Sequence, residues 1–244
     1  MIPCGHAAAG LTISYKGTKE SRRRDMRIGV IQASSQKSKN EALYRCTCRA
    51  VENNGRQDTV VNFGVFPDQD ASFSYIETAL NISLLLSSGA VDFIVTGCSS
   101  GQGMMLACNS LPGVLCGFVQ TPQDAYLFGR INGGNAVSLP LGLNYGWLGE
   151  INLQCTLDKL FDGTFGCGYP PEEAERKRRD TEALKRIGAI TKRPLTETWN
   201  RYDPALVRKA LCWEKVRNHV LQSGTQEDVL SIIRNHEIKS DGIL

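Results

Sequence analysis

The stretch "VDFIVTGCSSGQGMMLACNSLPG", residues 91–113, joins a buried-strand pattern to a helix-like pattern through a cluster of small residues. Its first seven residues are mostly apolar and rich in β-branched side chains, which is typical of a strand covered on both faces. Glycines then allow the chain to turn tightly, but a tight turn needs neither a thiol nor hydroxyl groups. Cys98, Ser99 and Ser100 at this joint are therefore candidates for a functional role.

The same alternation of strand and helix patterns extends from Met26 to about residue 165. Strand-like stretches occur at 27–34, 59–66, 91–97, 114–119 and 135–141, and helix-like stretches at 38–54, 71–89, 121–133 and 149–163, with a short helix after the joint. Strands that are apolar on both faces predict a parallel sheet covered by helices, here a doubly wound, five-stranded α/β/α sandwich. Ligands bind such sheets at the carboxyl ends of the strands, where the joint is expected to lie.

The two ends of the chain have a different character. Residues 1–25 lack the long apolar core of a secretory signal and are expected to form a disordered leader. The segment 166–244 is rich in charged helix-like stretches, at 170–188, 203–224 and 225–239, with a linker at 191–202. We therefore expect a sandwich domain at 26–165, followed by a helical extension that serves as a dimer arm or as a cover over the sheet.

The composition narrows the class of protein. Of the 244 residues, 41% are hydrophobic and 22% are charged, as in an ordinary soluble domain. A net charge of +3 does not by itself indicate a nucleic-acid or membrane partner, and no apolar run approaches the ~20 residues that span a bilayer. Most of the nine cysteines fall in apparent core elements, and Cys46 and Cys48 lack a second pair at zinc-ligand spacing. We expect reduced thiols, a cytoplasmic location and no metal.

The joint itself suggests two kinds of chemistry. The amides of residues 99–103 would lie at a helix N-terminus, which attracts anions and lowers the pKa of a nearby thiol. Cys98 could then act as a base or nucleophile, although a merely small buried residue explains it about equally well. Residues 97–101 also match the G-x-S-x-G elbow of serine hydrolases, with Ser99 as nucleophile. That alternative needs a histidine, and only His219 and His236 follow the joint.

A longer stretch, "VDFIVTGCSSGQGMMLACNSLPGVLCGFVQTPQDAYLFGRINGGNAVSLPLG", resembles the central block of the ribose-5-phosphate isomerase type B and galactose-6-phosphate isomerase family. That family has a Rossmann-like fold and reads Cys-Gly-Thr-Gly-Ile-Gly at the joint. The resemblance implies that Cys98 is the base that moves the substrate proton and that Ser100 assists at the sugar oxygens. It implies that the loop holds the enediolate and substrate, together with Ser99, Gly101, Gln102, Gly103, Asn132, Ser34 and Ser35.

The resemblance also indicates which residues would bind the substrate phosphate, although several of the family's residues are replaced in this sequence. The family has a helical arm whose arginines bind the phosphate of a dimer partner's substrate, and Arg176 and Arg179 are the best matches, with Arg130 a further candidate. The family's ring-opening histidine falls on Ile131, its early Asp-His pair on residues 33–34, and a later arginine on Gly142. Ser34, Ser35, Gln36 and Lys37 cluster at the end of the first strand, where they could contact a sugar or form only a polar loop with a helix cap.

The resemblance thus implies an aldose–ketose isomerase for a sugar phosphate, of the ribose 5-phosphate/ribulose 5-phosphate type. It implies no metal or organic cofactor and a homodimer or dimer of dimers. The departures leave open which sugar phosphate is used. They also leave open a homologue that binds a sugar phosphate without catalysis.

Overall fold

The computed structural model describes residues 25–241, so apart from Asp25 the expected leader lies outside the described residues. Five parallel strands form one sheet in the order β2-β1-β3-β5-β4. They are β1 (Arg27–Val30), β2 (Thr59–Asn62), β3 (Phe93–Cys98), β4 (Cys116–Phe118) and β5 (Ala136–Pro140). The predicted doubly wound parallel sheet is confirmed, although each strand is shorter than its apolar stretch.

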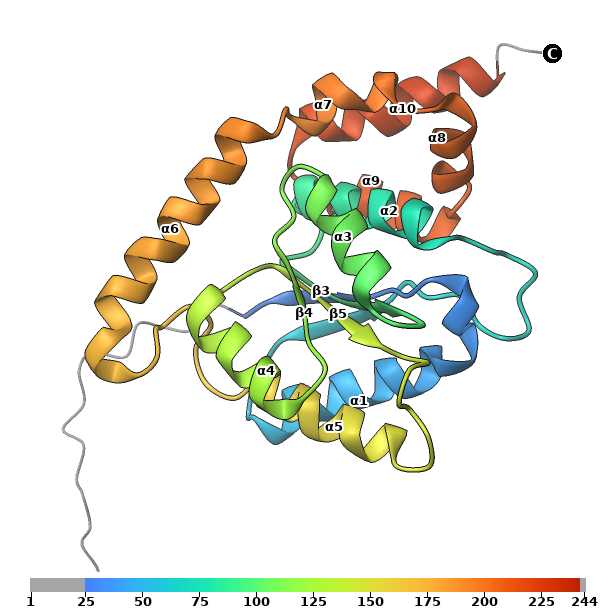
Figure 1. Cartoon of the computed structure of the whole chain (residues 1–244). Helices are drawn as coiled ribbons and strands as arrows, with labels where there is room; N and C mark the ends of the chain where they lie inside the picture. The colour runs from blue at the N-terminus through green and yellow to red at the C-terminus, as the bar shows by residue number, and fades with distance from the viewer. Residues whose placement is uncertain (1–24, 242–244) are drawn as a thin grey trace, which may run out of the picture.

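Helices cover both faces of the sheet (Figure 1). One face carries α1 (Asn40–Asn53), α4 (Pro122–Leu127) and α5 (Gly149–Leu160), and the other carries α2 (Tyr75–Ser87) and α3 (Gln102–Ser110). Each face has its own apolar core, because the strands are apolar on both sides and every inward helix face finds a partner.

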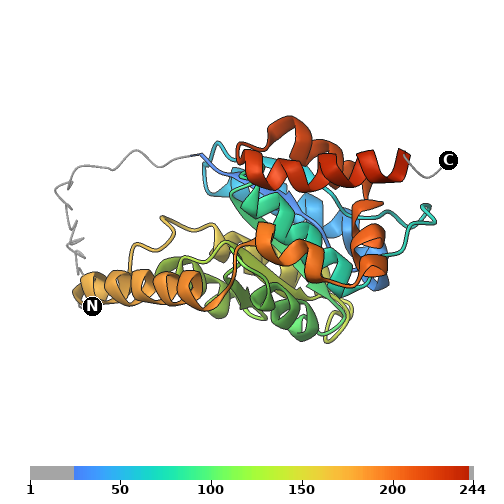
Figure 2. The ribbon, with the colours of Figure 1, turned by 90° about the horizontal axis from the view of Figure 1, so that it is seen from above.

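The tail adds a further helical layer outside α2 (Figure 1). The tail comprises α6 (Ala174–Thr191), α7 (Leu195–Thr198), α8 (Pro204–Leu211), α9 (Glu214–Ser223) and α10 (Glu227–Asp241), and the layer is formed by the helices after α6. Val216 and Val220 of α9 are fully buried in the same apolar core as Leu84 and Leu85 of α2. From above, α6 extends to one side of the sandwich before the chain returns over α2 (Figure 2). The expected domain boundary near residue 165 remains a prediction.

Tertiary contacts alter three expected elements. The helix expected at 203–224 breaks between α8 and α9, because Trp213 leaves helical geometry and stacks on Phe73 with ring centroids 4.0 Å apart. The linker at 191–202 contains α7 and a 3₁₀ turn, which bury Trp199. The helix expected at 121–133 ends as a π-helical turn, Phe128–Asn132. Short 3₁₀ turns also precede α1, at Ser34–Lys39, and α6, at Pro171–Glu173.

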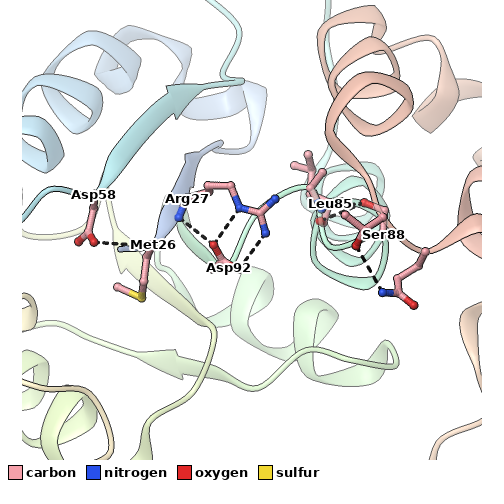
Figure 3. Close-up of polar contacts among 9 residues, drawn as sticks. Met26, Arg27, Asp58, Leu85, Ser88 and Asp92 are labelled. Atoms are coloured by element: carbon pink, nitrogen blue, oxygen red, sulfur yellow. Dashed lines mark hydrogen bonds and ion pairs between the residues drawn. The ribbon is translucent and has the colours of Figure 1, made fainter. Parts of the chain in front are cut away.

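Polar contacts fix the amino edge of the sheet (Figure 3). Arg27 at the start of β1 binds Asp92 through its backbone N–H at 2.9 Å and through two guanidinium N–H groups at 2.9 and 3.0 Å. Asp92 immediately precedes β3, and the backbone N–H of Met26 donates to Asp58 beside β2 at 2.8 Å. These contacts hold the first three strands in register at the edge opposite to the joint.

The order of the strands predicts a crevice at the carboxyl end of β3. The helix that follows β3, α3, lies on one face, whereas the helices that follow its neighbours β1 and β5 lie on the other. Diverging connections of this kind leave room for a ligand at the carboxyl edge. Cys98 is the last residue of β3, so the predicted joint lies at this crevice.

Candidate active site

The joint is a glycine-shaped turn from β3 into α3. Gly101 has a left-handed φ of 77°, and a Cβ there would lie 2.7 Å from the Phe118 ring. A Cβ on Gly97 would lie 2.4 Å from the carbonyl oxygen of Leu139, because β3 and β5 approach closely here. Only glycine meets both demands, so local sterics determine the path of the loop. Cys98 between them is 8% exposed and faces the apolar core beneath α2 and α3.

The N-terminus of α3 faces the crevice and carries no competing charge. Its N-cap is Gly101, so no side chain caps the helix, and its first turn contains no acidic residue. The hydroxyl of Ser100 accepts only a long contact, 3.4 Å, from the backbone N–H of Gln102. Free amides and the helix dipole make such an end suitable for a negative charge. The role of the loop from Ser99 to Gly103 in holding an oxyanion remains a prediction.

Two neighbouring loops support Ser99. The side-chain amide of Gln36 donates to the Ser99 hydroxyl at 2.8 Å, and the backbone N–H of Leu143 donates to the Ser99 carbonyl at 2.8 Å. A Cβ on Gly142 would lie 3.3 Å from both Gln36 and Ser99. The arginine that the family carries at Gly142 would thus enter the space that these two residues occupy.

The turn after β1 contributes less than expected. The Ser34 hydroxyl accepts from the backbone N–H of Phe73 at 2.8 Å, and the Ser34 N–H donates to the Phe73 carbonyl at 2.9 Å. Ser34 therefore anchors the segment that leads into α2, which is the polar-loop alternative. Ser35 is exposed and has no hydrogen-bond partner among residues 25–241.

The structure adds Tyr75 to the site and brings Gln36, one of the polar residues after the first strand, to Ser99. The Tyr75 ring lies 3.7 Å from the Cβ position of Gly103, and its side chain is exposed at the first residue of α2. Periodicity gave no signal for either residue, because each reaches the joint from a different part of the chain. Tyr75 could have been noticed as an aromatic residue one position after a Ser-x-x-Glu helix start.

Arg130 and Asn132 lie at the opposite edge of the sheet from Cys98 within one chain. Both precede β5, whose Ala136 pairs with Ile94, four residues before Cys98. Four residues of strand span ~13 Å, and the π-helical turn lies beyond that distance. Arg130 is 4% exposed and packs on the Tyr126 and Phe165 rings, and burial lowers its pKa. Arg130 therefore does not lie beside Cys98 within one chain, and its role as a phosphate ligand remains a prediction.

The two candidate arginines of the helical arm form ion pairs with neighbouring carboxylates. Arg176 pairs with Glu173 and Asp180, and Arg179 pairs with Glu175, all on α6 or the turn before it and all exposed. Exposed pairs of this kind contribute little to stability, so neither arginine is committed to its present partner. As phosphate ligands they remain predictions.

The hydrolase alternative lacks its histidine near Ser99. His219 on α9 packs edge-to-face on Phe63 at 5.0 Å and lies near the backbone of Ala90, which precedes β3. Burial lowers the pKa of His219. The side chain of His236 lies outside the described residues. No described histidine therefore completes a triad with Ser99.

Residues 25–241 offer neither a cluster of metal ligands nor a helix that could cross a membrane. No group of three or more His, Cys, Asp or Glu residues within that range is arranged to hold a metal ion. No helix there has the length and hydropathy that a bilayer crossing requires.

Comparison with known proteins places the chain in context. The model of the Ribose/Galactose Isomerase family matches residues 36–148. A crystal structure of 4-deoxy-L-threo-5-hexosulose-uronate ketol-isomerase, complexed with a tartrate, is 36% identical with a TM-score of 0.81, covering 86% of this chain and 98% of that one. The LacAB_rpiB ribose-5-phosphate isomerase of Vibrio parahaemolyticus is 32% identical with a TM-score of 0.81, covering 87% and 99%.

More distant structures share the fold alone. The type B ribose 5-phosphate isomerase of Trypanosoma cruzi is 21% identical with a TM-score of 0.56, covering 67% of this chain and 99% of that one. No curated protein sequence matches the chain.

Proposed function

The chain belongs to the ribose/galactose isomerase family and is an aldose–ketose isomerase, and we propose that Cys98 is its proton-transfer base. In this proposal the Cys98 thiolate takes the proton from C2 of the open-chain aldose, and the electron pair moves into an enediolate. The same thiol then returns the proton to C1 while the hydroxyl proton at O2 moves to O1, which gives the ketose. Reactant and product have the same atoms, so the reaction needs no oxidant.

The position of Cys98 carries the proposal. It is the last residue of β3, directly before a turn that leads to an uncapped helix N-terminus. A negative charge that develops on the sugar oxygens would be stabilised by these amides, with Ser100 beside them. Such an arrangement stabilises the enediolate more than the neutral sugar, which is the condition for catalysis.

We infer that the substrate is a sugar phosphate of the ribose 5-phosphate type. The Vibrio parahaemolyticus relative bears that name and aligns over nearly the whole of its own chain. In this proposal the phosphate is held by Arg176 and Arg179 from the arm of a second copy. The protein would then act as a homodimer, or a dimer of dimers, in the cytoplasm.

A sugar acid is the second candidate substrate, and the charges at the carboxyl edge favour it. The cations in the turn after β1 are Lys37, which donates to the Gln69 carbonyl at 3.0 Å, and Lys39, which lies over the Tyr145 ring. A lysine ammonium, such as that of Lys37 or Lys39, suits a carboxylate. The bidentate arginine contacts that are typical of phosphate recognition are absent from this turn in the described residues. The ketol-isomerase relative is named for a uronate.

Proton exchange in D₂O, followed by NMR, tests both parts of the proposal. The protein is mixed in turn with ribose 5-phosphate, galactose 6-phosphate, allose 6-phosphate and 4-deoxy-L-threo-5-hexosulose-uronate. Deuterium appearing in one of them identifies the substrate class. Cys98→Ala should lower the exchange rate by ~10²–10⁴-fold, the usual contribution of a positioned base.

A matched control separates the base from a buried thiol. Cys108→Ala removes a fully buried thiol from α3, outside the joint, and should keep its activity. Exchange that survives in folded Cys98→Ala would refute the role of Cys98.

A further inference from the structure

A cavity of about 320 Å³ opens at the carboxyl ends of β4 and β5, on the side of the sheet that carries α4 and α5 (Figure 1). Its volume falls at the lower end of the range for small-molecule sites. Leu139, Leu141 and Leu153 in its wall belong to the apolar core of that face. Cys98 belongs to the core of the opposite face. The cavity is therefore separate from the space above Cys98.

The wall of the cavity combines amides, hydroxyls and an aromatic ring, and none of its residues is charged. The polar lining residues are Gln120, Thr121, Asn144, Tyr145, Asn152 and Thr156. The remaining lining is leucine, proline and glycine. Amide and hydroxyl groups exchange hydrogen bonds with sugar hydroxyls in either direction, and apolar surface packs against the C–H face of a sugar ring.

Polar groups of this wall are free to bind a ligand that enters the cavity. Thr156 is 3% exposed, and its hydroxyl makes no hydrogen bond to any described residue. The side-chain amides of Asn144 and Asn152 likewise have no partner among residues 25–241. These hydroxyl and amide groups can therefore exchange hydrogen bonds with a ligand in the cavity.

The local charges select against an anion. The cavity lies between the first turns of α4 and α5, and each of these turns carries an acidic residue, Asp124 and Glu150. These carboxylates offset the positive end of the helix dipole. Two cations lie nearby, and neither is part of the wall: Arg45 pairs with Glu150, and Lys39 lies over the Tyr145 ring with its nitrogen 4.2 Å from the ring centroid. A phosphate or carboxylate would find no counter-charge in this cavity.

We propose that the cavity binds an uncharged sugar or polyol beside the reacting sugar. The two sites share a loop, because the N–H of Leu141 donates to the Cys98 carbonyl at 3.0 Å and that of Leu143 to the Ser99 carbonyl at 2.8 Å. Both leucines line the cavity. The proposal rests on the lining of the cavity and not on the role of Cys98.

Saturation-transfer NMR with D-ribose, D-galactose and glycerol as probes tests this site. The intact protein and Cys98→Ala should both give transfer to a neutral probe. The double variant Asn152→Leu with Thr156→Val should weaken binding by roughly tenfold, as expected for two lost hydrogen bonds. Asn200→Leu with Thr164→Val, two exposed positions outside the wall, is the matched control and should bind as the wild type does.

Three results would overturn the proposal. They are no transfer to any neutral probe, transfer unchanged in the double variant, and displacement of the neutral probe by ribose 5-phosphate. The last would place the probe above Cys98. If the double variant does not fold, Thr156→Val alone serves, because it removes one hydroxyl at constant shape. If the intact protein binds a neutral probe but isomerises no sugar, the result counts against the proposed function and not against this binding site.

Discussion

Replacing Gly101 by alanine should destabilise the protein for two separable reasons. The first is backbone conformation, because φ at Gly101 is 77° and an L-residue in this region costs about 1–2 kcal/mol. The second is space, because the added Cβ would lie 2.7 Å from the Phe118 ring and 2.9 Å from the Leu139 carbonyl carbon. The ring can shift, but the backbone of β5 cannot, and overpacking of this kind typically costs about 1–3 kcal/mol. The total is about 2–5 kcal/mol.

Gly55 isolates the first of these costs. Its φ is 60°, and a Cβ there would meet nothing within 4 Å. Gly55→Ala should therefore cost only the conformational part, about 1–2 kcal/mol. The difference between the two variants, about 1–3 kcal/mol, measures the contact with β5.

Thermal unfolding monitored by circular dichroism provides the assay. A domain of this size loses about 2–4 °C in Tm per kcal/mol. Gly101→Ala should therefore melt about 2–12 °C below Gly55→Ala, and it should lose turnover while Gly55→Ala keeps it. Equal Tm values for the two variants would refute the steric argument and imply that the joint relaxes freely.

Three further predictions concern charges and thiols away from the joint. Burial lowers the pKa of His219 below the unfolded value of 6.5. The stability gained by burying the neutral ring is therefore fully present above pH 6.5 and is lost as the pH falls. His219→Gln should make the urea midpoint fall less steeply between about pH 8 and about pH 5. Burial raises the pKa of Cys46 to about 11. A thiol reagent at about pH 8 should therefore label the exposed Cys155 but not Cys46, as measured by mass spectrometry. Equal labelling of the two thiols would contradict the burial of Cys46. A double-mutant cycle on Arg27 and Asp92 should give a coupling of about 1 kcal/mol, the upper end for partly exposed pairs because the contact is bidentate, and a coupling of zero would refute it.

Much of the fold follows from local patterns, and the exceptions depend on distant contacts. Apolar runs locate all five strands because each strand is covered on both faces. The break between α8 and α9 has no local signal, because Trp213 stops the helix by stacking on Phe73, far away in the sequence. The position of β5 between β3 and β4 is likewise set by packing and not by periodicity.

The candidate site also contains residues that a local motif predicts and residues that only the folded structure brings together. The residues from Cys98 to Gly103 are contiguous, so one motif predicts them together. Gln36 and Tyr75 reach the joint only through the turn after β1 and the start of α2. Alternation of apolar residues places the elements but not the side chains that meet at their ends.

Strand direction explains why the predicted sugar ligands before β5 do not meet Cys98. In a parallel sheet, residues that follow a strand and residues that precede one lie at opposite edges. Cys98 ends β3, whereas Arg130 and Asn132 precede β5. Only a second copy could bring them to a substrate above Cys98. Because Arg130 is buried between aromatic rings and Asn132 is exposed, Asn132 alone could contribute in this way without repacking. Asn135 has a structural role, because its side chain binds the backbone of Gly113 and Leu115 at 2.7 and 2.8 Å.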